Sequence, residues 1–185
     1  MKRVRSIVTA AAVAGLLALA PASLLAGEMC GLTTFLDEIR AGVKHEGFSS
    51  MCIAGQGCSI FSEKVDGHRL QLARRDGEKE WLVLLNVPAE ADISEGVELT
   101  VDKGEAMRVP PEFLEARAAG RAIAISNKLT GVVLPELKKG EALKWAYVLK
   151  SGKRQVVNIP LKGFGKVAGW AECAIRTLDD MARGK

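Results

Sequence analysis

Short runs in which apolar and polar residues alternate dominate the chain between residues 59 and 161. In RLQLARR (69–75), for example, Leu70 and Leu72 alternate with polar residues. A period of two is that of a strand with one buried face and one solvated face. Strands are also predicted within residues 59–65, 80–87, 98–104, 105–109, 121–126, 142–150 and 154–161. The run from Trp81 to Val87 is nearly all apolar, which predicts a central strand. Seven or eight short strands at hairpin spacing predict a mainly β fold, either an antiparallel β-sandwich or a rolled sheet.

Apolar residues at helical spacing precede the first of these strands and follow the last one. At the N-terminal side, Leu32, Phe35, Leu36 and Ile39 predict a short helix that ends near Gly42 or Gly47. The closing helix is predicted from Gly163 onward, with one apolar face made of Val167, Trp170, Ala171, Ala174, Ile175 and Leu178. Residues 129–140 predict one or two helical turns, 88–96 a polar connection and 112–119 an irregular crossover after two prolines.

The first residues have the features of a secretory signal peptide. Lys2, Arg3 and Arg5 precede an apolar run from Ile7 to Ala20, and small residues follow. We predict cleavage after Ala26, with Ala22 as the alternative; Cys30 comes too late for a lipoprotein signal. An exported chain without a remaining transmembrane segment is expected, located in the periplasm, secreted or at the cell surface.

The charge balance gives no reason to expect nucleic acid or anionic lipid as a partner. Three of the 26 Lys and Arg residues lie in the predicted leader, so 23 remain against 22 Asp and Glu. The mature chain is therefore nearly neutral, and a polyanion would find no excess of positive charge.

Four cysteines remain after the leader: Cys30, Cys52, Cys58 and Cys173. An even number in an exported chain predicts structural disulfides, and four cysteines allow three pairings. Cys52 and Cys58 can close a short loop, which would leave Cys30 and Cys173 to join the two ends of the mature chain.

The close cysteine pair has two alternatives to a structural disulfide, a redox pair or half of a metal site. Catalytic dithiols usually have C-x-x-C spacing at the start of a helix, whereas five residues separate Cys52 from Cys58. A metal site would need His45 and His68, the two histidines of the chain, as further ligands. We favour the disulfide, and predict no metal and no cofactor.

No catalytic residue is predicted. The chain contains no G-x-S-x-G, H-E-x-x-H or S-x-x-K motif, and both histidines lie beside turn glycines.

The tryptophans Trp81, Trp145 and Trp170 lie in apolar periodic segments and are predicted to be core residues. Basic residues alternate with apolar ones at Lys138, Lys139, Lys144, Lys150, Lys153 and Arg154. They are interpreted as a solvated face, with binding of an acidic surface as the alternative.

The segment IPLKGFGKVAGW (159–170) raises the question of a phosphate-binding loop. Only one residue separates Gly163 from Gly165, which excludes a P-loop, and Gly169 comes one residue too late for a dinucleotide fingerprint. We interpret the segment as a corner between strand and helix, with Phe164 packed in the core.

The segments LLNVP (84–88), GRAIAIS (120–126) and VNIPLKGFGKVAGW (157–170), with residues 93–105 and 132–148, resemble the invasion-associated locus B family of exported bacterial proteins. The resemblance extends from Trp81 to Ala174. It implies that Gly163, Phe164 and Gly165 form the corner between the family's closing strand and terminal helix. Cys52 and Cys58 are similar to its early cysteine pair, which is expected to be bridged. The usual tryptophan before the first cysteine and a second cysteine pair in the middle are absent from this sequence.

The predicted organisation is a signal peptide (1–26), an N-terminal helical segment (27–50) and a single β-rich domain of this family type (51–185). The resemblance implies a periplasmic or surface-associated protein that is not an enzyme and acts by binding an unknown protein of the envelope or of a host cell, with host-cell invasion as the associated process. The alternatives are an envelope thiol-redox or hydrolytic enzyme, or a carrier of an apolar ligand.

Overall fold

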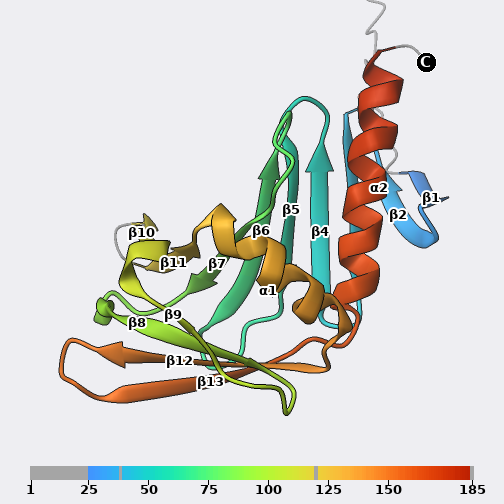
Figure 1. Cartoon of the computed structure of the whole chain (residues 1–185). Coiled ribbons are helices and arrows are strands. Elements are labelled where there is room, and N and C mark those ends of the chain that lie inside the picture. Colours follow the sequence, from blue (N-terminus) through green and yellow to red (C-terminus); the bar gives the residue numbers. More distant parts are fainter. Residues whose placement is uncertain (1–24, 38, 119–120, 184–185) are drawn as a thin grey trace, which may run out of the picture.

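The computed structural model describes residues 25–37, 39–118 and 121–183 (Figure 1). The predicted signal peptide lies outside this part of the chain, except for Leu25 and Ala26, which begin the first strand. The prediction of a mainly β, antiparallel fold with a C-terminal helix is confirmed.

The described residues form two antiparallel sheets, one of nine strands and one of four. The larger has the order β1 (Leu25–Met29), β2 (Leu32–Leu36), β3 (Arg40–His45), β4 (Phe48–Ile53), β5 (Gly57–Ser62), β6 (Arg69–Arg75), β7 (Leu82–Asn86), β11 (Ala122–Ile125) and β10 (Leu114–Arg117). The smaller has the order β13 (Arg154–Pro160), β12 (Ala142–Leu149), β8 (Ala91–Val101) and β9 (Met107–Val109).

The part of the chain that the structure describes also contains two α-helices and one 3₁₀ turn: α1 (Asn127–Lys139), α2 (Phe164–Ala182) and η1 (Pro111–Phe113). Helix α2 packs on β3, β4 and β5 of the large sheet, while the strands of the smaller sheet run across one end of the larger (Figure 1). Helix α1 contacts both α2 and β7. The helices and the smaller sheet therefore cover the same face of the large sheet, and the core lies beneath them.

The alternating pattern of the strands produces this core. Leu70 and Leu72 on β6 are fully buried, as their alternation with polar residues predicted. Trp81, Trp145 and Trp170 are at most 3% exposed, so their prediction as core residues is also confirmed.

The predicted N-terminal helix is wrong, because residues 27–50 form strands β1 to β4. The spacing of Leu32, Phe35 and Leu36 fits one face of a helix, but Thr34 is the buried residue and Phe35 is 53% exposed. Cys30 and Gly31 both have positive φ, which is the geometry of a two-residue hairpin turn between β1 and β2.

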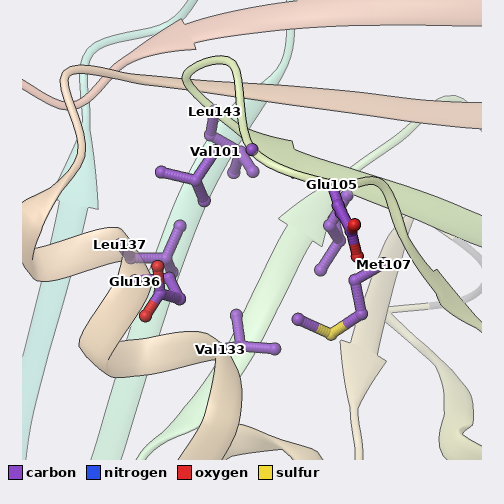
Figure 2. Close-up of a pocket in the computed structure, with 9 residues that line it drawn as sticks. Val101, Glu105, Met107, Val133, Glu136, Leu137 and Leu143 are labelled. Atoms are coloured by element: carbon purple, nitrogen blue, oxygen red, sulfur yellow. The ribbon is translucent and has the colours of Figure 1, made fainter.

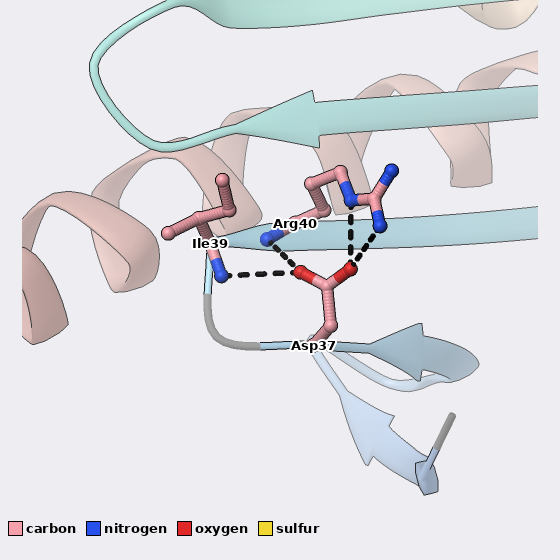
Figure 3. Close-up of polar contacts among 3 residues, drawn as sticks. All are labelled: Asp37, Ile39 and Arg40. Atoms are coloured by element: carbon pink, nitrogen blue, oxygen red, sulfur yellow. Dashed lines mark hydrogen bonds and ion pairs between the residues drawn. The ribbon is translucent and has the colours of Figure 1, made fainter. Parts of the chain in front are cut away.

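The connection from β2 to β3 is a turn organised by one carboxylate (Figure 3). Asp37 Oδ1 accepts hydrogen bonds from the backbone N–H groups of Ile39 and Arg40, at 3.1 and 2.7 Å. Its Oδ2 accepts from Nε of the Arg40 side chain at 2.7 Å. The hydrogen bond from the Arg40 side chain is the main cause that lowers the pKa of Asp37 below its ordinary value. This turn lets the chain reverse direction where the sequence pattern suggested a continuing helix.

Three smaller differences lie in the middle of the chain. Strand β8 begins at Ala91, inside the segment predicted as a polar connection. Residues 112–119 were predicted to be an irregular crossover, but Leu114–Arg117 pair with β11 as strand β10. Helix α1 has 13 residues, longer than predicted, because the Ser126 side chain caps its start and its buried side chains face the core; it ends at Gly140, as predicted.

Candidate interaction surface

The outer face of the large sheet, opposite α2, has a row of side chains without any charge. Successive ladder partners place one residue from each of six neighbouring strands in this row: Phe35, Gly42, Met51, Ser59, Ala73 and Leu82. The neighbour of Met51 in sequence, Cys52, faces α2, so Met51 faces away from the helix because side chains alternate along a strand. We call these six residues the uncharged row.

The uncharged row exposes large apolar side chains. Phe35 is 53% exposed and Met51 is 44% exposed. None of the six residues is charged, although 26% of all residues of the chain are. Aromatic residues and Met are enriched, and charges depleted, at the centre of protein–protein interfaces. The row therefore has the composition of an interface centre and not that of an ordinary solvated face.

Charged side chains lie on the two rows of ladder partners that flank the uncharged row. Arg40 and Arg75 belong to one flanking row and Lys44 to the other. Arg40 is paired with Asp37, and Lys44 Nζ lies 3.6 Å from a carboxylate oxygen of Glu63. This arrangement, an uncharged centre with charges at the margin, is also that of an interface.

The same face continues into a wide groove over β6, β7, β11 and β10. Leu82, Leu84 and Ala124 form part of its floor, and Glu115 and Arg117 form an ion pair at its edge. Strand β7 contributes apolar side chains to both faces of the sheet, since Val83 and Leu85 are buried on the inner face. The uncharged row was not predicted from the sequence. The nearly continuous apolar run from Trp81 to Val87 predicts a central strand. It also indicates that apolar side chains of β7 lie on both faces of the sheet.

The predicted site cysteines hold secondary-structure elements together. Cys52 and Cys58 are ladder partners on β4 and β5 and form a disulfide. Their sulfur atoms lie 3.9 and 3.5 Å from the carbonyl oxygen of Ala171 in α2. A disulfide has no S–H group, so this is a packing contact and not a hydrogen bond. The bridge lies in the core, under the helix.

The second disulfide joins Cys30, in the turn between β1 and β2, to Cys173 in α2. Its two ends are 143 residues apart in the sequence. Of the three pairings that the sequence allowed, the structure therefore has the one that closes a short loop and joins the two ends. With both cysteines of the close pair in a disulfide, the metal site considered from His45, His68, Cys52 and Cys58 loses two of its ligands.

The two histidines occupy different environments. His68 Nδ1 lies 2.9 Å from the carbonyl oxygen of Asp66, which requires a proton on Nδ1. In the neutral ring, Nε2 then accepts a hydrogen bond from the Tyr147 hydroxyl at 2.9 Å, and burial raises the pKa of that hydroxyl. His45 Nε2 lies 3.3 Å from Glu46 Oε2, an ion pair only when the ring is protonated.

The corner segment is held by close packing. Gly163 has a positive φ of 84° at the start of α2, and a side chain there would collide with Glu46. Phe164 is fully buried, with its ring centroid 5.2 Å from that of Phe48. A Cβ on Gly165 would lie 2.5 Å from the Lys138 carbonyl oxygen of α1. The corner thus joins the closing strand to α2 and packs that helix on α1.

The lysine before this corner has a partner within the chain. Lys162 Nζ lies 3.3 Å from Glu46 Oε1, and the hydrogen bond from Lys162 is the main cause that lowers the pKa of Glu46. The anion beside the start of α2 is therefore a carboxylate of the protein itself. Two members of the basic cluster are also paired, Lys138 with Glu172 and Arg154 with Glu98.

A cavity of about 100 Å³ lies between α1 and the smaller sheet (Figure 2). Its apolar wall consists of Leu99, Val101, Met107, Val133, Leu137 and Leu143. Glu136 of α1 and Glu105 of the connection from β8 to β9 also line it, and both are exposed.

Within the described residues, no helix combines the length and the hydropathy needed to span a bilayer. The same part of the chain contains no cluster of three or more His, Cys, Asp or Glu side chains arranged to hold a metal ion.

These features define a class: a mainly β protein of two antiparallel sheets, with two disulfides and an uncharged surface on the larger sheet. The model of the invasion associated locus B (IalB) protein family matches residues 40–169, more than half of the sequence, so the chain belongs to that family. The resemblance stated from sequence segments is thereby confirmed. Comparison with curated proteins finds no match.

A solved structure shows the same fold. The crystal structure of invasion associated protein B from Bartonella henselae superimposes with a TM-score of 0.54 at 17% sequence identity, covering 77% of this chain and 98% of that one. At this identity the likeness concerns the fold alone.

Proposed function

We propose that the chain is exported to the bacterial envelope and acts there, without catalysing a reaction, by binding another protein through the outer face of its large sheet. The observation that carries the proposal is the uncharged row, in which the side chains of Phe35 and Met51 are exposed. Membership of the IalB family supports the location in the envelope, and its name associates the protein with host-cell invasion.

The position of the cysteines supports a binding role over thiol-redox catalysis. Cys52 is fully buried and Cys58 is 4% exposed, beneath Ala171 of α2. Reactive cysteines lie in partly exposed, electropositive surroundings, because an incoming thiol or disulfide must reach the sulfur. Here a substrate would first have to displace a core helix.

Site-specific photocrosslinking in living cells tests the proposed surface. A photoreactive amino acid at Met51 is expected to capture a partner protein, whereas the same residue at Val156 is expected to capture none. Val156 is a matched control, because it is 48% exposed and lies on a strand of the other sheet. Equal capture at both positions, or capture at neither, would contradict the proposed surface.

Cell fractionation tests the proposed location in the envelope, and an invasion assay tests the proposed role in host-cell entry. We expect the chain in the periplasmic or surface fraction, and we expect a Met51→Glu variant of normal stability to lower host-cell entry. A chain retained in the cytoplasm would contradict the envelope location. Unchanged entry in a strain that lacks the protein would contradict a role in invasion and leave the binding surface to be judged by the crosslink.

A further inference from the structure

The cavity between α1 and the smaller sheet combines an apolar wall with one sign of charge. Val133 and Leu137 of α1, at most 2% exposed, face the cavity together with Leu99 and Met107 from the sheet. The charged residues of its lining are both acids, Glu105 and Glu136. Figure 2 shows them on different sides, Glu136 on the helix and Glu105 on the connection from β8 to β9.

The helix places these groups by simple periodicity. Val133, Glu136 and Leu137 stand at positions i, i+3 and i+4 and so lie on one face of α1. Val132, the neighbour of Val133, is 56% exposed and is not part of the lining. The apolar residues close the inner end of the cavity, and the two exposed carboxylates stand where a ligand would meet solvent.

We infer that this cavity binds a small organic cation with an apolar tail, of the class of alkyl or aryl ammonium ions. The tail leaves water for the apolar wall, which supplies most of the affinity. The ammonium group lies beside Glu105 and Glu136, where an exposed ion pair adds little affinity but discriminates against anions. The cavity has a volume of about 100 Å³, below that of sites for drug-sized ligands, so it accommodates a short apolar tail and no larger group.

The cavity is separate from the proposed interaction surface, because no residue of the uncharged row lines it. Its two carboxylates make no ion pair among those of the described residues. An incoming cation therefore does not have to displace a basic side chain of the protein.

A titration of the full mature protein with three probes of equal chain length tests the inference: hexylammonium, 1-hexanol and hexanoate. The readout is the NMR signal of the Met107 methyl group, which lies in the cavity wall. At low ionic strength we expect saturable shifts with hexylammonium binding about three- to fivefold more tightly than hexanol, and hexanoate most weakly. High salt should remove most of this preference.

Variants separate the contributions of the wall and of the charges. Val133→Phe fills the cavity and is expected to abolish binding of all three probes, while Val132→Phe on the exposed side of the same helix leaves binding unchanged. Glu105→Gln with Glu136→Gln should retain hexanol binding and make the affinities of hexylammonium and hexanol equal. If Val133→Phe does not fold, the double glutamine variant still tests whether the two carboxylates favour the ammonium probe.

Several results would overturn the inference. These are a Met107 signal that does not respond to any probe, equal affinities of the wild-type protein for the three probes, or an ammonium preference that survives in the double glutamine variant. Loss of binding in Val132→Phe would place the ligand elsewhere on the helix.

Discussion

The indole Nε1 of Trp170 in α2 donates a hydrogen bond of 3.0 Å to Oγ1 of Thr34 in β2. The two residues are 136 positions apart, and both are buried. The family model matches residues 40–169, so this bond connects two segments that flank the matched region. The Cys30–Cys173 disulfide connects the same two segments. The β1–β2 hairpin is therefore fixed to the C-terminal helix by one covalent bond and one buried polar contact.

We predict that Thr34→Val lowers the free energy of unfolding by about 1–3 kcal/mol, because the buried indole N–H of Trp170 loses its acceptor while the shape of the side chain is kept. Urea denaturation followed by circular dichroism measures this difference. Thr33→Val is the control, since Thr33 is the exposed neighbour on the same strand and should change stability by less than about 0.5 kcal/mol. Equal effects of the two variants would show that the hydrogen bond does not matter.

Replacing both Cys30 and Cys173 by serine should destabilise the protein by up to about 5 kcal/mol, the loop-entropy estimate for a bridge that spans 143 residues. Both cysteines are only half-buried, so loss of packing contributes little. Hydrogen exchange is expected to increase most in residues 25–36, the hairpin that the bridge holds. An unchanged free energy of unfolding in the double serine variant would contradict this prediction.

Gly165→Ala and Gly169→Ala are predicted to change stability in opposite directions. A Cβ on Gly165 meets the Lys138 carbonyl oxygen at 2.5 Å, so the two helices must separate, at a cost of about 1–3 kcal/mol. A Cβ on Gly169, within the same helix, meets no atom within 4 Å, and alanine should there stabilise the helix by about 0.5–1 kcal/mol. Thermal unfolding of the two single variants measures both effects, and a change in the same direction for both would contradict the packing described.

Arg40→Gln is predicted to raise the pKa of Asp37 toward its ordinary value, because the hydrogen bond from the Arg40 side chain is the largest cause of the lowered pKa. The backbone N–H groups of Ile39 and Arg40 still donate, so part of the lowering remains. Carboxyl carbon chemical shifts, measured by NMR against pH, report this pKa directly. Arg117→Gln, which removes a similarly exposed arginine from the Glu115 ion pair, is the control and should leave the Asp37 pKa unchanged.

The sign of the linked pH effect on stability follows from the same shift. A carboxyl group whose pKa is lower in the folded state stabilises that state when ionised, so the contribution is present at neutral pH. It is lost as the pH falls below about 4, the ordinary range of aspartate, and through the lower folded pKa. Asp37→Asn should therefore show less acid destabilisation than the wild-type protein between about pH 4 and 2. An equal loss in both proteins would contradict a role for this turn.

The strands and the closing helix were predictable because their patterns are local. Leu70 and Leu72 alternate with polar residues, and a strand is the conformation that puts them on one face. Trp170, Ala171 and Ala174 likewise recur at helical spacing and are buried on one side of α2. The fold class follows from the number and spacing of such segments.

The N-terminal segment could not be predicted in this way, since Leu32, Phe35 and Leu36 have helical spacing, whereas the strand buries Thr34 and exposes Phe35. Its strand conformation depends on partners far away in the sequence, namely Trp170 for Thr34 and Cys173 for Cys30. The candidate surface was hidden for a similar reason. Phe35, Met51 and Leu82 come together only through the register of six strands, which no single segment contains.

Local sequence patterns are enough to predict that this chain is mainly β, that it has a closing amphipathic helix and that its tryptophans belong to the core. The pairing of the cysteines, the conformation of the segment before Cys52 and the side chains of the uncharged row depend on the tertiary structure. The physical reason is that periodicity acts through neighbours in the chain, whereas pairing, register and buried polar contacts depend on residues that packing brings together.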